Sequence, residues 1–314
     1  MRYEKLGKSD LTVSVVGLGT WVLGGTHWGR TDDELSIATI HKALDAGINL
    51  IDTAPAYGDG HAEEIIGKAV NGLREKVVIA TKCGVHRVGR QFRFILKPED
   101  IRKELENSLR RLGIETIDLY QCHWPDPDTP IEATMSEMRA MQEEGKIRYI
   151  GVSNFDVPLL ERALSVAPVV SLQPHYSLLE RKIEEETLPF CRSHHIGVLA
   201  YGSLGSGILT GKYSEPPCFG KGDCRSFFYP FYKEPYWSRT QDLLAEMREI
   251  AHTRNKPLAQ VAINWVNQQR GVTTALVGAR NPEQALANAS AGEWQLSPAE
   301  LGSISAACDR IFSD

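Results

Sequence analysis

A carboxylate and a tyrosine lie close together in the segment N-L-I-D-T-A-P-A-Y-G-D-G, residues 49–60. Its apolar run ends in Asp52, and Tyr57 follows five residues later. Pro55 and Gly58 are residue types that a turn favours, but a turn does not require an acid at the end of a buried strand. The position of Asp52 therefore indicates a role that depends on other parts of the chain.

Proton transfer is the chemistry that these residue types suit. A tyrosine with an ordinary pKa of ~10 is a poor proton donor near neutrality. A nearby ammonium favours the phenolate and lowers that pKa, and a carboxylate beyond the ammonium keeps it charged. Lys82 is the candidate ammonium, and His123, if neutral, is a candidate partner for a substrate carbonyl. Such a set protonates an oxygen while a hydride reaches the carbon, so it requires a reduced cofactor.

Alternating strands and helices are expected to position these side chains. The strands are short, nearly continuous apolar runs, which is typical of parallel strands covered on both faces. They are expected at Val13–Leu18, Ile48–Ile51, Val77–Thr81, Ile117–Gln121, Ile147–Val152, Val169–Leu172, Ile196–Ala200 and Thr274–Val277. Helical patterns cover Asp33–Ala46, Pro98–Leu112, Val157–Leu164, Ile183–His194, Thr240–Gln269 (with a break before Pro257) and Pro282–Ala289. Thr129 and Glu132 have the spacing of a capping box at the start of one more helix.

Eight strands alternating with helices predict an α/β fold, a single (β/α)8 TIM barrel over residues 1–314. The alternative, a doubly wound sheet, requires G-x-G-x-x-G after an early strand. In G-L-G-T-W-V-L-G-G, residues 17–25, the third glycine position holds Val22, so the barrel is favoured. A long aromatic loop, Tyr213–Arg239, follows the seventh strand. It is interpreted either as a lid over one barrel face or as an ordinary packed excursion.

Polar residues follow nearly every predicted strand. In barrel enzymes the C-terminal ends of the strands share one rim, and the chemistry lies there. In strand order these residues are Gly19-Thr20-Trp21, Asp52, Lys82, His123-Trp124, Ser153-Asn154, Gln173, Tyr201-Gly202-Ser203 and Gly278-Ala279-Arg280. A single polar residue at a strand end is usually a helix cap or a solvated group. Convergence of several on one rim predicts a functional site, because unpaired charges there are costly.

Composition excludes several classes of partner. A net charge of −5 and a pI near 6.0 argue against nucleic acid and against an anionic membrane. No stretch approaches the ~20 apolar residues that span a bilayer. The N-terminal residues do not resemble a signal peptide, and the scattered cysteines do not resemble a disulfide framework. A cytoplasmic protein is expected, with free thiols favoured over a redox-dependent bridge between Cys218 and Cys224.

The motifs resemble those of the aldo-keto reductases in family order along essentially the whole chain. They are G-L-G-T-W (17–21), I-D-T-A-P-A-Y-G (51–58), A-T-K-C-G (80–84), D-L-Y-Q-C-H-W (118–124), G-V-S-N-F (151–155), L-Q-P-H-Y (172–176), Y-G-S-L-G-S-G-I-L-T-G (201–211) and G-A-R-N-P-E-Q (278–284). The D-L-Y-Q-C-H-W-P-D-P segment is most similar to the bacterial branch that contains general stress reductases. The resemblance implies a barrel that binds NADPH and reduces aldehydes or ketones to alcohols.

The resemblance also implies roles for individual residues. Asp52, Tyr57, Lys82 and His123 match the catalytic tetrad, with Tyr57 as general acid. Ser153, Asn154 and Gln173 match positions that hold the nicotinamide carboxamide, and Tyr201 matches the aromatic that stacks on the ring. The pyrophosphate is expected along Gly202, Ser203, Leu204, Gly207, Leu209, Gly211 and Lys212. Arg280 is expected at the adenosine 2′-phosphate, which favours NADPH over NADH, and Gln284 and Asn288 at the adenine. Gly19, Thr20, Trp21, Gly278 and Ala279 complete the cofactor set, and Trp21 and Trp124 suggest an apolar pocket for an aromatic or medium-chain carbonyl substrate.

Three other readings are weighed against the reductase. A Schiff-base aldolase would need a neutral Lys82, which Asp52 opposes. A metal-dependent hydrolase is disfavoured because His194 and His195 are adjacent rather than at ligand spacing, so no metal is predicted. The chain also resembles the potassium-channel β-subunits, which are cofactor-sensing members of the same family. A monomer or weak homo-oligomer that acts on a small carbonyl compound is the expected state.

Overall fold

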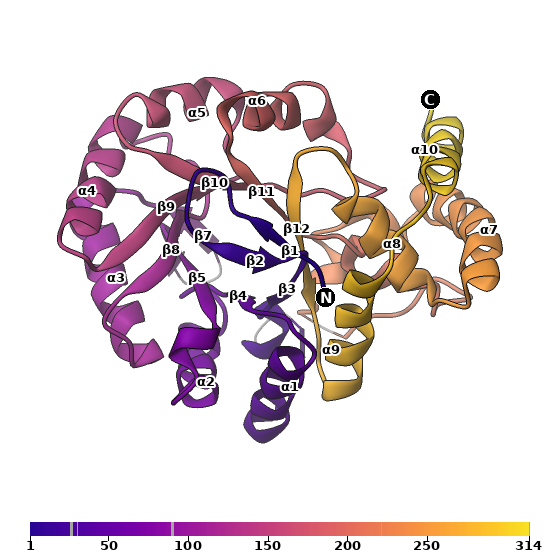
Figure 1. Ribbon diagram of the computed structural model, residues 1–314, viewed down its shortest axis with the longest axis horizontal. Helices are drawn as coiled ribbons and strands as arrows, with labels where there is room; N and C mark the ends of the chain where they lie inside the picture. Colours follow the sequence, from indigo (N-terminus) through magenta and orange to yellow (C-terminus); the bar gives the residue numbers. More distant parts are fainter. Residues whose placement is uncertain (26–27, 30, 89–90, 221, 314) are drawn as a thin grey trace.

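The barrel predicted from the sequence is confirmed by a computed structural model, which describes residues 1–25, 28–29, 31–88, 91–220 and 222–313. Eight parallel strands close in the order β10-β11-β12-β3-β4-β5-β8-β9 (Figure 1). These strands are β3 (Val16–Gly19), β4 (Leu50–Asp52), β5 (Val78–Cys83), β8 (Ile117–Cys122), β9 (Ile147–Ser153), β10 (Val169–Gln173), β11 (Gly197–Ala200) and β12 (Val272–Gly278).

Helices surround the strands and bury the outer face of the barrel (Figure 1). They are α1 (Asp33–Asp45), α2 (His61–Ala69), α3 (Pro98–Leu112), α4 (Ile131–Glu143), α5 (Val157–Leu164), α6 (Thr187–His194), α7 (Tyr236–Arg254), α8 (Leu258–Asn267), α9 (Pro282–Ala289) and α10 (Pro298–Phe312). Short 3-10 helices are η1 (Trp21–Leu23), η2 (Arg74–Lys76), η3 (Lys182–Glu184), η4 (Gly205–Thr210), η5 (Cys224–Ser226), η6 (Pro230–Tyr232) and η7 (Ser290–Glu293).

Helix α3 shows how the sequence determines the bounds and the buried face of a helix in this layer. Pro98 starts it, Gly113 ends it in the left-handed conformation, and Ile101, Leu105 and Leu112 are buried on one face.

An N-terminal hairpin closes one end of the barrel. Strands β1 (Tyr3–Lys5) and β2 (Thr12–Ser14) pair antiparallel and cross the centre of the ring of strands (Figure 1). Leu6, Leu11 and Val13 from this segment are buried with side chains that fill the barrel interior, including Leu50 and Leu199. The interior is therefore packed and closed at the N-terminal ends of the strands, which leaves the C-terminal rim as the open end.

Several predicted elements differ in detail from the structure. The run Val13–Leu18 is divided between β2 and β3, because the chain bends at Val15 between the hairpin and the barrel. The capping box at Thr129 is wrong: α4 starts at Ile131 after Pro130, and no side chain caps it. The pattern predicted over Ile183–His194 is η3 followed by α6. Helix α7 begins at Tyr236, so the long aromatic loop is four residues shorter at that end than predicted.

A second hairpin was not foreseen. Strands β6 (Val85–Val88) and β7 (Gln91–Phe94) pair antiparallel directly after β5. The hydrogen bond from Ile95 N to Gly84 O, 3.0 Å, closes its base. Because β5 ends at the rim, this hairpin stands beside the open end of the barrel.

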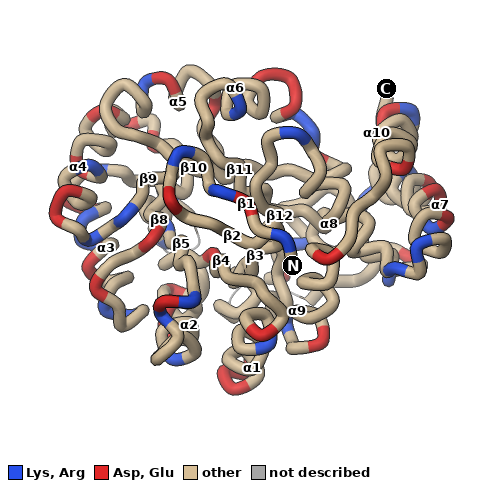
Figure 2. Tube along the Cα trace, in the orientation of Figure 1, with Lys and Arg blue, Asp and Glu red and all other residues tan. Residues whose placement is uncertain are grey.

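Charged residues are spread over the molecule. Lysine and arginine alternate with aspartate and glutamate along the trace, without a surface of one sign (Figure 2). Within the described residues, none of the helices has the length and apolar character needed to cross a bilayer. The cysteines are free thiols, with Cys218 exposed and Cys224 buried.

Candidate active site

Lys82 joins Asp52 to Tyr57 at the floor of a cleft in the open end. Its Nζ donates to Asp52 Oδ2 at 2.7 Å and to Thr53 O at 2.8 Å, and lies 3.2 Å from Tyr57 Oη. Lys82 is fully buried and Asp52 is 3% exposed. The predicted carboxylate, ammonium and phenol are therefore brought together in the order that the proton-transfer hypothesis requires.

The barrel register determines this arrangement. Asp52 is the last residue of β4 and pairs with Ala80 of β5, so Lys82 lies two residues further along the neighbouring strand and faces the same interior. The Asp52 carbonyl accepts hydrogen bonds from Thr20 N at 3.0 Å and Thr20 Oγ1 at 2.9 Å. Asp52 is thus fixed through both its backbone and its side chain.

Two glycines let the Tyr57 turn approach the loop that follows β3. A Cβ on Gly58 would lie 2.1 Å from Gly24 O, and a Cβ on Gly24 would lie 2.6 Å from the Tyr57 carbonyl carbon. Gly58 also has a φ of +70°, which other residues rarely adopt. The A-Y-G sequence is therefore needed to bring Tyr57 over the floor of the cleft.

The second carboxylate oxygen of Asp52 is held by two glutamines. Gln173 Nε2 donates to Oδ1 at 2.7 Å, and Gln121 Nε2 lies at 3.4 Å from it. Gln173 was predicted to hold the nicotinamide carboxamide, and in the structure its amide nitrogen is directed to Asp52. Gln121 was not predicted to belong to the site. It lies within β8, and a position inside a strand indicates only a place in the packed interior.

Burial controls the electrostatics of the phenol. Burial, with a smaller contribution from the charge of Asp52, raises the pKa of Tyr57 well above its usual value. The sequence prediction of a lowered pKa is therefore wrong, because removal from water disfavours the charged phenolate and is the largest influence on this pKa. Burial also lowers the pKa of Lys82, while Asp52 acts in the opposite direction. The phenol is consequently a neutral, protonated group near pH 7.

His123 lies beside Tyr57 with its ring edge-on to the phenol. The ring centroids are 5.9 Å apart with an interplanar angle of 82°. Burial, followed by the charge of Lys82, lowers the pKa of His123 well below its usual value. The imidazole is therefore neutral near pH 7, as the hypothesis about a carbonyl partner requires.

A hydrogen-bonded platform adjoins the tetrad. Tyr201 Oη donates to Asn154 Oδ1 at 3.0 Å, and Asn154 Nδ2 lies 3.0 Å from both Ser153 Oγ and His123 O. Ser153 Oγ in turn donates to Gln173 O at 2.7 Å. Behind this network, the His175 ring stacks on Tyr201 at 5.1 Å and 10°. Tyr201 therefore presents a fixed flat face, which suits a stacked nicotinamide ring.

The glycine-rich segment after β11 fits a pyrophosphate. Gly202, Gly205, Ser206 and Gly207 all have positive φ, and a Cβ on Gly207 would meet only Tyr232 Oη within 4 Å, at 3.8 Å. Backbone turns of this kind expose amide groups to an anion. Ser206 Oγ is buried, lines the cleft and has no hydrogen-bond partner in the described part of the chain. An incoming phosphate oxygen would supply one.

Cations and amides lie at the far end of the same cleft. Arg280 Nη2 donates to Trp28 O at 2.7 Å, and Arg280 N donates to Gln284 Oε1 at 2.9 Å. Arg225, which was not predicted, lies 5.2 Å above the Trp28 ring and pairs with Asp223. The donor set at this end suits a phosphorylated nucleoside.

One cleft of about 640 Å³ gathers most of the predicted site residues. It is lined by Gly19, Thr20, Trp21, Asp52, Tyr57, His123, Trp124, Ser153, Asn154, Gln173, Tyr201, Gly202, Ser203, Leu204, Gly207, Lys212, Gly278, Arg280, Gln284 and Asn288. Four predicted residues do not line it: Lys82 lies beneath the floor, Leu209 and Ala279 are buried in the outer core, and Gly211 packs on Leu258.

One part of the cleft wall, the β6–β7 hairpin, was not predicted from the sequence. Val85, Phe92 and Phe94 come from the β6–β7 hairpin, and Phe228 and Tyr229 come from the long aromatic loop. The alternation in Q-F-R-F, residues 91–94, is the strand signal that could have located the hairpin. The aromatic loop does form part of the cleft, as the lid interpretation proposed.

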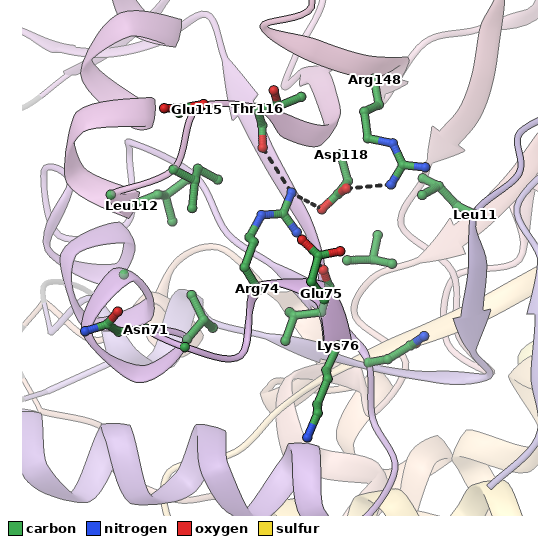
Figure 3. Close-up of a pocket in the computed structure, with 18 of the residues that line it drawn as sticks. Leu11, Asn71, Arg74, Glu75, Lys76, Leu112, Glu115, Thr116, Asp118 and Arg148 are labelled. Carbon is green, nitrogen blue, oxygen red and sulfur yellow. Dashed lines mark hydrogen bonds and ion pairs between the residues drawn. The ribbon is translucent and has the colours of Figure 1, made fainter.

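A separate hollow of about 1150 Å³ lies at the opposite end of the barrel. Arg74 and Arg148 reach Asp118 from two sides there (Figure 3). Asp118 Oδ2 is 2.7 Å from Arg74 Nη2, and Oδ1 is 2.9 Å from Arg148 Nη1. Ile79 N also donates to Asp118 at 2.9 Å, so this carboxylate is fully paired. Among the described residues, no group of three or more histidine, cysteine, aspartate or glutamate side chains is arranged to hold a metal.

Comparisons with known proteins agree with this geometry. Residues 15–309 match the model of the Aldo/keto reductase family. The chain is 41% identical to Aldo-keto reductase YhdN of Bacillus subtilis (strain 168), over 100% of this chain and 96% of that protein. It is 38% identical to the NADH-specific methylglyoxal reductase of Escherichia coli (strain K12), over 96% of each. The structure of the glycerol dehydrogenase AKR11B4 from Gluconobacter oxydans superimposes with a TM-score of 0.92 at 41% identity, over 99% of this chain and 96% of that one. The chain belongs to the aldo/keto reductase family, whose oxidoreductases reduce carbonyl compounds with a nicotinamide cofactor.

Proposed function

We propose that the protein reduces aldehydes and ketones to alcohols with NADPH and that Tyr57 is the general acid. The observation that carries this proposal is the chain Asp52–Lys82–Tyr57, with Lys82 Nζ 2.7 Å from Asp52 and 3.2 Å from the phenol oxygen. The phenol faces a cleft whose other end has the donors that a phosphorylated nucleoside needs.

The side chains divide the work of proton transfer. The reduced nicotinamide, when bound, supplies the hydride that the carbonyl carbon accepts. Tyr57 keeps its proton until negative charge develops on the carbonyl oxygen, and then transfers it to give the alcohol. The ammonium of Lys82 stabilises the resulting phenolate, and Asp52 keeps that ammonium in place. Solvent then returns a proton to Tyr57.

His123 has a positioning part in this proposal. Its neutral imidazole, edge-on to the Tyr57 ring, can donate a hydrogen bond to the same carbonyl oxygen that Tyr57 protonates. Two donors that converge on one oxygen fix the carbonyl in a single orientation. The carbonyl carbon is then held toward the face of Tyr201, where we place the nicotinamide.

The preference for NADPH rests on the cationic end of the cleft. Arg280, Arg225 and Lys212 line it, and a 2′-phosphate has oxygens for the planar donors of an arginine. The E. coli relative carries an NADH-specific name, so the cofactor preference is the part of the proposal that most needs measurement. In this chain Asp223 neutralises Arg225, which leaves Arg280 as the main phosphate partner.

An aldolase mechanism is less well supported. A lowered pKa of Lys82 is the direction that a Schiff-base lysine needs. Lys82 is nevertheless fully buried, makes three hydrogen bonds and does not line the cleft. A substrate carbonyl therefore reaches Tyr57 before it reaches the lysine.

Fluorescence titration with NADPH and NADH tests cofactor binding, and oxidation of the bound cofactor with 4-nitrobenzaldehyde and methylglyoxal tests turnover. We expect tighter binding of NADPH and turnover of at least one aldehyde. Binding without turnover of any carbonyl would contradict the reductase assignment and favour a cofactor sensor. Failure to bind either nucleotide would contradict the assignment of the whole cleft.

A further inference from the structure

Two aromatic side chains lie side by side where the chain leaves β10 and β11. His175 comes two residues after β10, and Tyr201 directly follows β11. The two residues form a parallel β-bridge, in which Tyr201 N donates to Pro174 O and Tyr176 N donates to Tyr201 O, both at 3.0 Å. Paired residues of neighbouring strands direct their side chains to the same side of the sheet. The backbone pairing therefore sets the stack of the two rings, whose centroids are 5.1 Å apart with planes at 10°.

The two faces of the Tyr201 ring have different neighbours. Tyr201 lines the cleft and His175 does not, so the imidazole covers the face that is turned away from the cleft. The hydrogen bond from Tyr201 Oη to Asn154 Oδ1, 3.0 Å, fixes the position of the hydroxyl. It does not prevent rotation of the ring about its long axis. The imidazole opposes this rotation, because a tilted phenol ring would lose the stacked contact.

His175 is itself confined on several sides. A Cβ on Gly202 would lie 2.4 Å from His175 Cδ2, so the imidazole packs directly against the backbone that follows Tyr201. Tyr229 and Phe231 of the aromatic loop contact the imidazole at centroid distances of 5.9 and 6.3 Å, with interplanar angles of 64° and 50°. The imidazole therefore has little space in which to move away from Tyr201.

The contacts of this imidazole are aromatic rather than polar. Its Nε2 atom is buried and has no hydrogen-bond partner among the described residues. Burial also lowers the pKa of His175 to about 4, so the ring is uncharged near pH 7. What His175 supplies behind Tyr201 is consequently a flat, neutral surface.

We propose that His175 is a positioning residue for the cofactor: its ring supports Tyr201 from behind and keeps the face that receives the nicotinamide at a fixed tilt. This inference rests on the function proposed above. Hydride transfer requires close alignment of the donor and acceptor carbons, and a small displacement of either lowers the rate strongly. His175 thus acts on the reaction through Tyr201, without lining the cleft itself.

NADPH and 2′,5′-ADP give the sharpest binding test, because 2′,5′-ADP keeps the phosphorylated adenosine and lacks the nicotinamide. Their dissociation constants are measured near pH 7 by calorimetry for the wild-type protein and for His175→Ala. We expect His175→Ala to bind NADPH about fivefold more weakly, which corresponds to about 1 kcal/mol, and to bind 2′,5′-ADP as before. Unchanged NADPH affinity would overturn the proposal. An equal loss for the two ligands would also overturn it, since the whole cleft would then be disturbed.

His175→Phe and His175→Leu separate a flat support from simple space filling. Phenylalanine keeps a flat ring, whereas leucine fills a similar volume without one. We expect His175→Phe to bind NADPH within about twofold of the wild-type protein, and His175→Leu to bind it about as weakly as His175→Ala. Urea melts verify that each variant is folded. Recovery of the affinity by leucine as well as by phenylalanine would show that only volume matters, and would refute the support of a fixed tilt.

His194→Ala is the matched control. His194 is exposed, belongs to α6 and stacks on Phe190 at 4.0 Å and 22°, and neither residue lines the cleft. Its substitution also removes a histidine from a stacked aromatic pair, and it is expected to leave NADPH affinity unchanged. An equal loss of affinity in His194→Ala and His175→Ala would overturn the proposal.

Kinetics at saturating NADPH test the alignment itself. We expect kcat with 4-nitrobenzaldehyde to fall about tenfold in His175→Ala and the KM for the aldehyde to change little, because the nicotinamide is bound but poorly aligned. The primary isotope effect on kcat with NADPH deuterated at C4 is expected to increase, since hydride transfer becomes slower relative to product release. Unchanged kcat and an unchanged isotope effect in folded His175→Ala would refute the positioning role.

The binding arm separates this inference from the proposed reaction, because it needs no turnover. Selective loss of NADPH affinity in His175→Ala, together with no reduction of any carbonyl compound by the wild-type protein, would refute the reaction and leave the support of Tyr201 standing. Reduction of carbonyl compounds by the wild-type protein, together with equal losses of NADPH and 2′,5′-ADP affinity in His175→Ala, would refute the role of His175 alone.

Discussion

Two buried carboxylates at opposite ends of the barrel have different surroundings. Asp52 ends β4 at the open rim, and Asp118 is the second residue of β8 at the end that the N-terminal hairpin covers. Asp118 accepts hydrogen bonds from two arginines and one backbone amide. The role of these contacts is structural, because they link strands and loops to one another. Asp52 is equally well paired, but its lysine continues to Tyr57, which faces the cleft.

The comparison indicates that a buried ion pair is a candidate for catalysis when its cation also contacts a reactive group that faces the cleft. Arg74 uses its remaining donors on the Val77 and Thr116 carbonyls, so its network ends in backbone. Lys82 uses one donor on Thr53 O and still lies 3.2 Å from a phenol at the substrate cleft. Substitutions at the rim are therefore expected to change activity, and substitutions around Asp118 to change stability.

Tyr57→Phe tests this division most strongly. Loss of the phenol oxygen removes the proposed general acid, and kcat is expected to fall about 10³-fold. NADPH affinity and the free energy of unfolding are expected to stay nearly the same, because the ring remains. Steady-state kinetics, a fluorescence titration and a urea melt measure the three quantities.

Tyr149→Phe is the matched control for that substitution. The Tyr149 hydroxyl accepts a hydrogen bond from Asp10 N at 3.2 Å, at the end of the barrel remote from the cleft. Its removal is expected to leave kcat within about twofold. A large loss of NADPH affinity in Tyr57→Phe, or an equal loss of kcat in both variants, would contradict the role given to Tyr57.

Asp118→Asn is the corresponding test at the closed end. It leaves Arg74 without its carboxylate and Arg148 with only the exposed Asp10, and loss of the carboxylate from these partly exposed pairs is expected to cost about 2 kcal/mol, less than for a fully buried pair. We expect the free energy of unfolding in urea to fall by that amount, with kcat per folded molecule unchanged. Asp10→Asn, which removes only an exposed partner of Arg148, is expected to change stability by less than about 0.5 kcal/mol. Loss of turnover in folded Asp118→Asn would end the distinction between the two carboxylates.

A fall in pH provides a further test at the open end of the barrel, because a histidine is buried there. Burial lowers the pKa of His175 to about 4, below the ordinary value of 6.5. The folded protein therefore holds a neutral imidazole that the unfolded chain protonates below pH 6.5. This contribution to stability is complete above pH 6.5 and is lost as the pH falls toward 4, with a cost of about 2 kcal/mol at pH 5.

His175→Phe keeps a flat ring behind Tyr201 and removes the titrating group. We expect the loss of stability between pH 7 and pH 5, measured by urea melts, to be smaller in this variant by about 2 kcal/mol. A variant that loses as much stability as the wild-type protein would show that His175 does not carry the acid sensitivity.

The rim could be predicted from sequence because strand ends can be read locally. Asp52, Lys82 and His123 each follow an apolar run, and a parallel barrel brings such positions together whatever the exact strand bounds. Gln121 could not be found in this way, since it lies within a strand and its contact with Asp52 depends on the barrel register. The rise in the pKa of Tyr57 also required the structure, because burial and the charge of Asp52 both raise it and the burial of the phenol is known only from the folded chain.

The substrate wall was less predictable than the rim. Phe94 meets Trp124 only because a hairpin of two short strands folds back beside the barrel. Short exposed strands carry little hydrophobic periodicity, so their pairing is decided by tertiary contacts. The aromatic loop was recognised by composition, yet composition did not indicate that Phe228 lies in the cleft while Phe227 does not.

Arg280→Ala gives the smallest expected effect. It compares one arginine of the closed end, Arg74, with one arginine of the cleft, Arg280. Arg74 is committed to Asp118 and two carbonyls, whereas Arg280 is exposed and donates from its side chain to Trp28 O. Removal of Arg280 is therefore expected to leave stability nearly unchanged. NADPH affinity is expected to fall about tenfold, because a hydrogen bond to a charged group is worth about 1.5 kcal/mol. NADH lacks the 2′-phosphate and is expected to bind as before. Parallel fluorescence titrations measure both, and an equal loss for the two nucleotides would show that Arg280 does not contact the 2′-phosphate and would move that role to Arg225 or Lys212.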